Sequence, residues 1–217
     1  MILENLFKQF EVPLWGIGSL EKVVQHTHEY KYIVFCLPYE SAAIEALPDD
    51  RLMNLCKSDL GERTKTIYNT LIEELNDCTF VSYDDVDREF GLGQKGISQK
   101  VLGHLAGLGW IGRSSLLVTP KFGPRVRLGT MFTKDDIGFT GQPFLGSCGE
   151  CMACSEVCPS SAISKHVYDT SKCRQIVTNA QGKYKMFCGL CMQVCPIGTS
   201  THRMQQTRTN HAVDAER

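Results

Sequence analysis

Residues 148–159 read Cys148-Gly-Glu-Cys151-Met-Ala-Cys154-Ser-Glu-Val-Cys158-Pro159. A second run, Cys188-Gly-Leu-Cys191-Met-Gln-Val-Cys195-Pro196, follows after a lone Cys173. Each run closes with three residues, a cysteine and a proline, and a proline there ends a short helix and turns the chain back. The chain has no other internal repeat, so these two half-motifs organise the interpretation of the whole sequence.

The spacing of the first run, C-x2-C-x2-C-x3-C-P, is typical of cysteines that hold [4Fe–4S] clusters. Where two clusters are present, the fourth cysteine of such a run binds the other cluster. We therefore predict two interleaved ligand sets, and no cysteine of the segment is left over. Set A is Cys148, Cys151, Cys154 and Cys195, and set B is Cys158, Cys173, Cys188 and Cys191.

Zinc binding and disulfide formation account for the cysteines less well. Paired C-x2-C knuckles also bind zinc, but a zinc site takes a closed set of four ligands and has no need of the x3-C-P endings. Disulfides need an oxidising compartment. The first residues lack the basic stretch and long apolar run of a secretory signal, so we expect a cytoplasmic protein with reduced thiols.

Composition is consistent with a chain that buries one core and carries a small metal-binding module. The 217 residues are 42% hydrophobic and 22% charged. The longest apolar run, 32–37, is too short to cross a bilayer, so we expect no membrane association. We predict an α+β protein with an α/β domain at 1–143, a two-cluster ferredoxin-like domain at 144–198 and a polar tail at 199–217.

The formal net charge of −1 gives no reason to expect nucleic acid bound over the whole surface. From Lys172 onward, however, seven Lys and Arg residues face only Asp214 and Glu216. This basic end is interpreted first as a solvated face that balances the negative clusters, and second as an RNA-binding surface.

Apolar periodicity and turn signals predict the elements before the cysteines. The expected helices are 2–10, 20–29, 41–47, 64–75 and 97–105, and the expected strands are 14–19, 32–37, 80–83, 116–118 and 125–132. Strand 32–37 is expected to be buried on both faces, whereas strand 125–132 alternates as a half-exposed strand does. Cys36, Cys56 and Cys78 are expected in the core, and His26 and His28 at the surface.

The segment from Gly107 to Arg113 is rich in glycine. Gly107, Gly109 and Gly112 satisfy G-x-G-x-x-G, but the dinucleotide motif follows a strand and opens a helix, and here a helix is expected before it and a strand after it. We interpret the segment as a glycine-rich turn that lets the backbone approach a planar or bulky group, with Trp110 as a packing anchor.

Several motifs together resemble epoxyqueuosine reductase and its reductive-dehalogenase relatives. They are Tyr32-Ile-Val-Phe-Cys-Leu-Pro-Tyr39, Ala106-Gly-Leu-Gly-Trp-Ile-Gly-Arg-Ser-Ser-Leu-Leu117, Phe122-Gly-Pro-Arg-Val-Arg-Leu-Gly129 and the cysteine pattern. The resemblance implies a nitroreductase-like α/β domain followed by a two-cluster domain. It also implies that electrons pass one at a time to a cobalamin, which acts on an epoxide in a tRNA nucleoside or on a carbon–halogen bond.

The resemblance also implies functional residues. The acceptor is expected at the glycine-rich turn, lined by Gly107, Gly109, Trp110, Ile111, Gly112 and Arg113. The family places a proton-donating Asp before that turn, but here Gly93 and Gly96 stand at that place. Asp84 and Asp85 in the polar loop that precedes them are the candidates for the acid.

Three functions follow from these observations. The first is an iron–sulfur oxidoreductase that receives electrons from a ferredoxin- or flavodoxin-type protein and passes them to cobalamin, or to a flavin as second choice. The second is an electron carrier or reductive activator that docks on an acceptor protein without an organic cofactor. The third is a structural role for the clusters, with the basic end bound to RNA such as tRNA.

Overall fold

The computed structural model describes residues 2–22, 30–49, 51–80, 98–177 and 188–199. The architecture is mixed α/β, and the chain divides into two compact units. The first unit holds Met1–Tyr39, Leu55–Trp110 and Arg127–Gly146, and the second holds Glu40–Asn54, Ile111–Val126 and Ser147–Arg217. Residues 40–54 and 111–126 therefore belong with the cysteines, although they are far from them in sequence.

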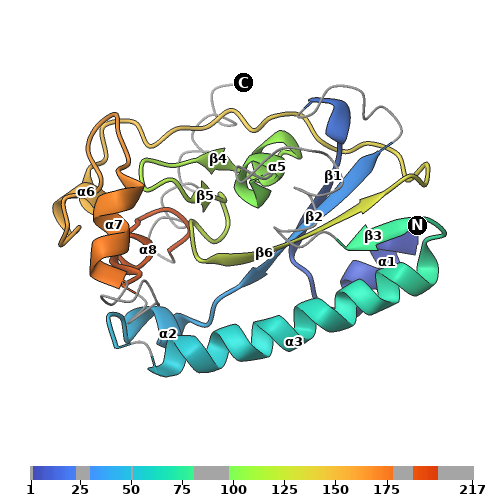
Figure 1. The fold of residues 1–217 in the computed structure, drawn as a ribbon, viewed down its shortest axis with the longest axis horizontal. Helices are drawn as coiled ribbons and strands as arrows, with labels where there is room; N and C mark the ends of the chain where they lie inside the picture. The colour runs from blue at the N-terminus through green and yellow to red at the C-terminus, as the bar shows by residue number, and fades with distance from the viewer. Residues whose placement is uncertain (1, 23–29, 50, 81–97, 178–187, 200–217) are drawn as a thin grey trace, which may run out of the picture. The chain divides into compact units, whose positions relative to one another are not determined.

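The helices range from long to very short (Figure 1). They are α1 (Ile2–Gln9), α2 (Ser41–Glu45), α3 (Arg51–Glu74), α5 (Gln99–Leu105), α6 (Ala153–Glu156), α7 (Thr170–Val177), α8 (Leu190–Gln193) and the 3₁₀ turn η1 (Leu20–Lys22). No helix among the described residues is long and apolar enough to cross a membrane.

A four-stranded sheet forms the centre of the first unit. Its strand order is β1 (Leu14–Ser19), β2 (Lys31–Pro38), β6 (Val126–Thr133) and β3 (Cys78–Phe80). Strand β1 pairs antiparallel with β2, and β3 pairs antiparallel with β6. A separate two-stranded sheet joins β4 (Trp110–Ile111) to β5 (Leu117–Val118).

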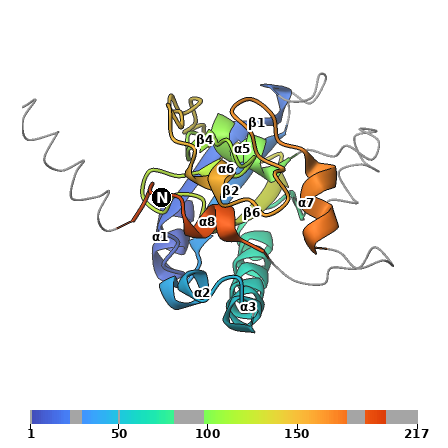
Figure 2. The same cartoon turned by 90° about the vertical axis from the view of Figure 1, so that its left-hand side faces the viewer.

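Strand β2 is buried on both faces, as its apolar run predicted. The Tyr32 hydroxyl donates a hydrogen bond to the Leu102 carbonyl of α5 at 3.2 Å. The Phe35 ring packs against Phe7 of α1 and Tyr68 of α3, with ring centroids 5.7 Å apart in both pairs. Because successive strand residues point to opposite faces, α5 covers one face of β2, and α1 and α3 cover the other (Figure 2).

The expected elements at 2–10, 14–19, 32–37, 41–47 and 97–105 are confirmed within a few residues at their ends. Helix α5 precedes the glycine-rich segment, the short strand β4 lies within it and β5 follows, so no helix opens there and the dinucleotide motif is absent, as expected. Residues 23–29 and 81–83, parts of an expected helix and strand, lie outside the described residues. So do His26 and His28.

A strand is present at the expected position, 125–132, but the prediction that it is half-exposed was wrong. In β6 the residues from Gly129 to Thr133 are all buried. The physical reason is that other elements pack on β6: the Thr130 N–H donates to the Tyr68 hydroxyl of α3 at 2.9 Å, and the Phe132 ring contacts Tyr32 with centroids 6.4 Å apart. Alternation in sequence predicts a strand with one wet face, but it does not show which helices cover the sheet.

Helix α3 begins well before the expected residue 64. Asp49 marks its start: a carboxylate oxygen accepts the Arg51 backbone N–H at 3.1 Å, and both carboxylate oxygens accept the guanidinium. An acidic side chain that accepts an N–H of the first turn stabilises a helix start. This first part also contains the apolar but exposed Leu52 and Leu55, which make its amphipathic pattern less clear than that of residues 64–75.

Two of the three cysteines outside the cysteine-rich segment lie in the core, as expected. Cys36 is fully buried, and Cys56 is 6% exposed. Burial raises the pKa of Cys36 to about 12, so this residue stays a neutral thiol. Cys78, expected in the core as well, is only half-buried.

Gly129→Ala is expected to destabilise the sheet. A Cβ at this position would lie 2.2 Å from Cζ of the buried Phe35 ring, so the ring or the strand must shift. Overpacking of this kind costs about 1–3 kcal/mol, which urea unfolding of the anaerobic protein would measure.

Gly61→Ala is the matched control. Gly61 lies inside α3, and a Cβ there would meet nothing within 4 Å. Removing a glycine from a helix interior is expected to stabilise the protein by about 0.5–1 kcal/mol. Equal stability of the two variants would contradict the packing of Gly129 on Phe35.

Candidate metal centre

Eight cysteines of the second unit lie at the ends of very short helices. Cys154 is on α6, Cys173 on α7 and Cys191 on α8, and the others flank these helices. Cys151 is exposed, and the other seven are half-buried. Thiols placed in this way are within reach of a bound group and partly sheltered from water.

Both cysteine runs use the same local backbone device. In each run a glycine directly follows the first cysteine and has a positive φ, +51° at Gly149 and +61° at Gly189. This left-handed conformation is readily adopted only by glycine. The chain therefore turns sharply between the first and second cysteine of each run. In the first run this turn is closed by a hydrogen bond of 3.1 Å from the Cys151 N–H to the Cys148 carbonyl.

In set A, Cys148 and Cys151 lie close enough to Cys154 and Cys195 to influence the ionisation of both. Burial raises the pKa of Cys195, and the negative charges of Cys148 and Cys151 add to the rise. Burial likewise raises the pKa of Cys154, with Cys148 and Cys151 again adding to it. The structure thus brings Cys195, from the second run, beside cysteines of the first.

The thiols of set B are gathered around Cys191. Burial, and after it the charges of Cys188, Cys154, Cys173 and Cys158, raises the pKa of Cys191 to about 12. Three of these four neighbours belong to set B. The charges that reach Cys191 from outside the second run therefore come from Cys158 and Cys173 of set B and from Cys154 of set A.

Tyr168 accompanies set B. Burial raises the pKa of its phenol, and so do a hydrogen bond to Cys173 and the charges of Cys173, Cys191 and Cys158. A phenol that stays protonated is a hydrogen-bond donor to sulfur. Tyr168 was not singled out in the sequence, where a lone tyrosine has no distinguishing signal.

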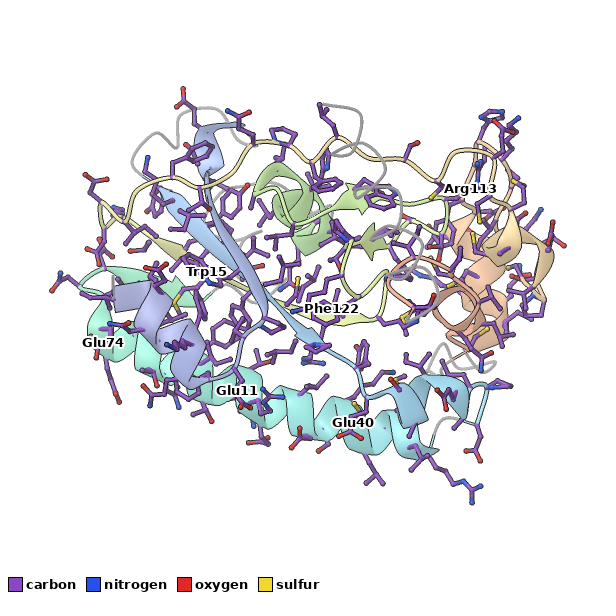
Figure 3. The ribbon with its side chains drawn as sticks, turned by 180° about the vertical axis from the view of Figure 1, so that it is seen from behind. Glu11, Trp15, Glu40, Glu74, Arg113 and Phe122 are labelled. Carbon is purple, nitrogen blue, oxygen red and sulfur yellow. The ribbon has the colours of Figure 1, made fainter. Side chains whose placement is uncertain are left out.

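Arg113 holds the start of the first run (Figure 3). Its backbone N–H donates to Cys148 Sγ at 3.4 Å. Its guanidinium donates to the carbonyls of Cys151 at 3.0 Å and Gly149 at 2.7 Å, and also to that of Lys165. The fork of donors in an arginine matches several carbonyls at once, so Arg113 fixes the loop that carries two thiols of set A.

Arg125 holds the end of the second run in the same way. Its guanidinium donates to the carbonyls of Ile197 at 2.7 Å and Phe122 at 3.2 Å, and also to that of Cys195. Burial lowers the pKa of Arg125, and the nearby Cys195 opposes this effect. This residue lies within a motif that carries the family resemblance, but its contact with Cys195 could not be foreseen.

Glycines let the backbone beside Arg125 pack closely. Gly198 has φ +76°, and a Cβ on it would lie 2.2 Å from the Gly123 nitrogen. Gly123 has φ +59°, and a Cβ on it would lie 2.1 Å from the Ile197 carbonyl oxygen. The chain after Cys195 is therefore held against residues 122–125 by direct backbone contact.

Gln193 anchors α8 on α2. Its side-chain Nε2 donates toward the carbonyls of Ile44 at 3.1 Å, Glu45 at 3.0 Å and Leu47 at 3.0 Å. These carbonyls lie at the C-terminal end of α2, where a helix leaves acceptors without intrahelical partners. Gln193 therefore caps one helix and positions another, and its place between Cys191 and Cys195 was the only sequence signal for it.

The structure divides the expected cofactor-binding residues between the two units. Ile111, Gly112 and Arg113 lie with the cysteines, and a Cβ on Gly112 would meet Val118 at 2.6 Å and Cys148 Sγ at 3.5 Å. Gly107, Gly109 and Trp110 lie in the first unit. Asp84 and Asp85, the expected acids, lie outside the described residues.

Trp110 is packed in the first unit as expected of an anchor. It is 8% exposed and stacks on Phe144 with ring centroids 5.8 Å apart. Its Nε1 is buried and has no hydrogen-bond partner among the described residues. A buried indole N–H normally finds an acceptor, and none of the described residues supplies one here.

Within the described ranges, no three His, Cys, Asp or Glu side chains are placed to hold one metal ion. A [4Fe–4S] cluster makes a different demand, because it is held by four separate thiolates that surround a cube of irons. Mostly half-buried thiols near one another, with the pKa values of Cys154, Cys191 and Cys195 raised by burial and by neighbouring cysteines, are the donor set that a cationic iron–sulfur core would stabilise. The residues of sets A and B fit such a group.

No family profile matches the chain. In sequence it is 28% identical to the epoxyqueuosine reductase of Staphylococcus aureus over 171 residues, which are 71% of this chain and 43% of that protein. The chain spans about two fifths of the length of the curated relatives it matches.

Two solved structures show the likeness of fold. An epoxyqueuosine reductase with an epoxyqueuosine-modified tRNA-Tyr stem loop has TM-score 0.61 at 16% identity, covering 92% of this chain and 66% of that one. A reductive dehalogenase, whose structure suggests a mechanism for B12-dependent dehalogenation, has TM-score 0.70 at 20% identity, covering 94% of this chain and 33% of that one. The resemblance expected from the sequence is confirmed.

Gly198→Ala is expected to destabilise the second unit. The alanine would adopt a left-handed φ at about 1–2 kcal/mol and would also overlap the Gly123 backbone, which adds about 1–3 kcal/mol. Thermal unfolding of the anaerobic protein, followed by circular dichroism, would measure the loss.

Gly149→Ala is the matched control, because Gly149 also has a positive φ but a Cβ on it would meet nothing within 4 Å. Gly149→Ala should therefore lose only the stability that the left-handed backbone conformation costs, about 1–2 kcal/mol. Equal losses in the two variants would contradict the close contact of residues 198 and 123.

Proposed function

We propose that this chain is an iron–sulfur oxidoreductase whose eight clustered cysteines bind two [4Fe–4S] clusters. The observation that carries the proposal is the grouping of the thiols, with Cys195 beside Cys148 and Cys151, and Cys191 beside Cys158, Cys173 and Cys188. When bound, such clusters accept and release single electrons. In this proposal set A holds one cluster and set B the other.

The described residues would orient and shield these clusters. Arg113 and Arg125 hold carbonyls next to Cys151 and Cys195, so the thiols of set A are pre-positioned. Cys158 receives hydrogen bonds from Ser160, Ala162 and Ile163, which outweigh its burial and lower its pKa. A thiol held by such donors is stabilised as the thiolate that iron requires.

The proposed electron acceptor is a cobalamin held by Gly107, Gly109, Trp110, Ile111, Gly112 and Arg113, with Asp84 or Asp85 as proton donor. Its support is the likeness to a B12-dependent reductive dehalogenase, together with the buried Trp110 Nε1 that has no partner among the described residues. The likeness to a reductase solved with a tRNA stem loop makes a tRNA nucleoside the proposed substrate.

The proposal keeps the organisation expected from the sequence. The α/β domain at 1–143 would be nitroreductase-like and the domain at 144–198 ferredoxin-like, followed by the tail at 199–217. A ferredoxin- or flavodoxin-type protein would supply the electrons. Each electron from that donor would pass through the clusters to the cobalamin acceptor.

Iron analysis of double variants tests both the clusters and their interleaving. Reconstituted anaerobic protein is expected to hold about eight irons per chain. Cys148→Ser with Cys195→Ser removes two ligands of set A only, so about four irons should remain. Cys148→Ser with Cys191→Ser removes one ligand from each set, so both clusters should be lost.

The control for iron analysis is Cys78→Ser, which changes a half-buried cysteine of the first unit and should keep all the iron. If the Cys148→Ser, Cys195→Ser variant lost all its iron, as the other double variant should, each run would hold its own cluster and the ligand sets would not be interleaved as proposed. Zinc in place of iron in the wild-type protein would overturn the proposed function.

Cobalamin titration of the cluster-loaded protein tests the acceptor. Binding is expected to shift the visible spectrum of the cobalamin. Trp110→Phe keeps the ring but deletes the buried N–H donor, so the Kd should rise roughly fivefold, the effect of about 1 kcal/mol from one hydrogen bond. No spectral shift at saturating cobalamin would remove this acceptor while leaving the two clusters untouched.

A further inference from the structure

The two ligand sets differ in the fixed positive charge around them. Arg113 donates to the Cys151 carbonyl and by its backbone N–H to Cys148 Sγ, and it lowers the pKa of Cys154 against the larger opposite effect of burial. Arg125 donates to the Cys195 carbonyl and opposes the rise in the pKa of that thiol. All four cysteines of set A are thus close to one of two guanidinium groups.

Neither guanidinium is hydrogen-bonded to a carboxylate in these contacts, because every acceptor named for them is a backbone carbonyl. The nearby Lys165 is different, since its ammonium pairs with Glu150 at 3.2 Å. The positive charges of Arg113 and Arg125 therefore act on set A with no carboxylate of the described residues hydrogen-bonded to them.

Set B has a different environment. Burial contributes most to the raised pKa of Cys191, and the charges of four other cysteines add to it. Lys172 and Arg174 flank Cys173 on α7, but both are exposed, so water screens their charges. Tyr168, near three thiols of set B, is neutral while it is protonated.

Hydrogen bonds to sulfur do not distinguish the sets as clearly as charge does. Cys158 of set B receives several bonds, and Cys148 of set A receives the Arg113 N–H. Solvent exposure favours a higher reduction potential for set A, as positive charge does, because the one exposed thiol of the eight, Cys151, belongs to set A. Net charge, hydrogen bonds and exposure are the factors by which a protein sets the potential of such a cluster.

We infer that Arg113 and Arg125 are positioning residues that give the set A cluster the higher reduction potential of the pair. The physical reason is that a fixed positive charge stabilises the cluster form that carries one more electron. An electron that enters at set B would then move to set A, and the arginines would set that direction. This inference rests on the proposed two-cluster function and adds the order of the two clusters to it.

A redox titration of the cluster-loaded protein, followed by electron paramagnetic resonance, tests the inference. The protein is poised with dithionite and mediators, and each cluster takes up one electron in its own transition. The Cys148→Ser, Cys195→Ser double variant, which retains only set B, identifies the transitions. In the wild-type protein the transition that is missing from this variant should be the one at higher potential.

The arginine variants test the cause. Arg125→Met and Arg113→Met are each expected to make reduction of the set A cluster at least about tenfold less favourable, which is about 59 mV for one electron. Arg125→Lys and Arg113→Lys keep the charge, so they should retain most of the potential. Arg51→Met is the control, since Arg51 pairs with Asp49 in the same unit and its side chain is 86% exposed.

Each outcome decides the inference. It is overturned if set B titrates at the higher potential in the wild-type protein, a comparison that needs no arginine variant. It is also overturned if the methionine variants keep their iron and both transitions stay in place, or if the lysine variants shift as far as the methionine variants. Wild-type protein without two clusters would overturn the proposed function first, and the iron content distinguishes that failure.

Discussion

The crowding of cysteine thiols is the constraint on which the second unit depends. Burial and the charges of four other cysteines raise the pKa of Cys191 to about 12, so ionising these thiols together is unfavourable. Unopposed negative charge at such distances favours separation of the segments that carry it. The structure meets this constraint with backbone contacts and fixed positive charge, and a cationic group bound among the thiols would complete the balance.

The cysteine segments are anchored through their carbonyl groups because they contain little regular structure. Helices α6 and α8 each span four residues, too few to satisfy their own carbonyls by intrahelical bonds. Side-chain donors hold the loops beside these helices: Arg113 and Arg125, from residues 111–126, bind carbonyls next to the two runs, and Gln193 reaches the end of α2 in residues 40–54. These contacts are the reason that two remote segments belong to the same compact unit as the cysteines.

The sheet-containing unit follows a different principle, since apolar burial organises it. Local patterns predicted its elements where one face or both faces of an element were apolar over its full length, as in α1 and β2. They failed for the burial of β6, which depends on side chains of other elements such as Tyr68 of α3 and Tyr32 of β2. The first half of α3 was less clear than its second half, because Leu52 and Leu55 are apolar but exposed.

The sequence by itself determined the positions of the eight clustered cysteines, the two half-motifs and the main elements of a mixed α/β fold, because spacing and apolar periodicity are local properties. Only the tertiary structure decided which cysteines lie together and which residues hold them. Arg125 and Cys195 are joined across 70 residues, and Gln193 and Ile44 across 149. Contacts at such separations depend on how the whole chain packs, and no local pattern encodes them.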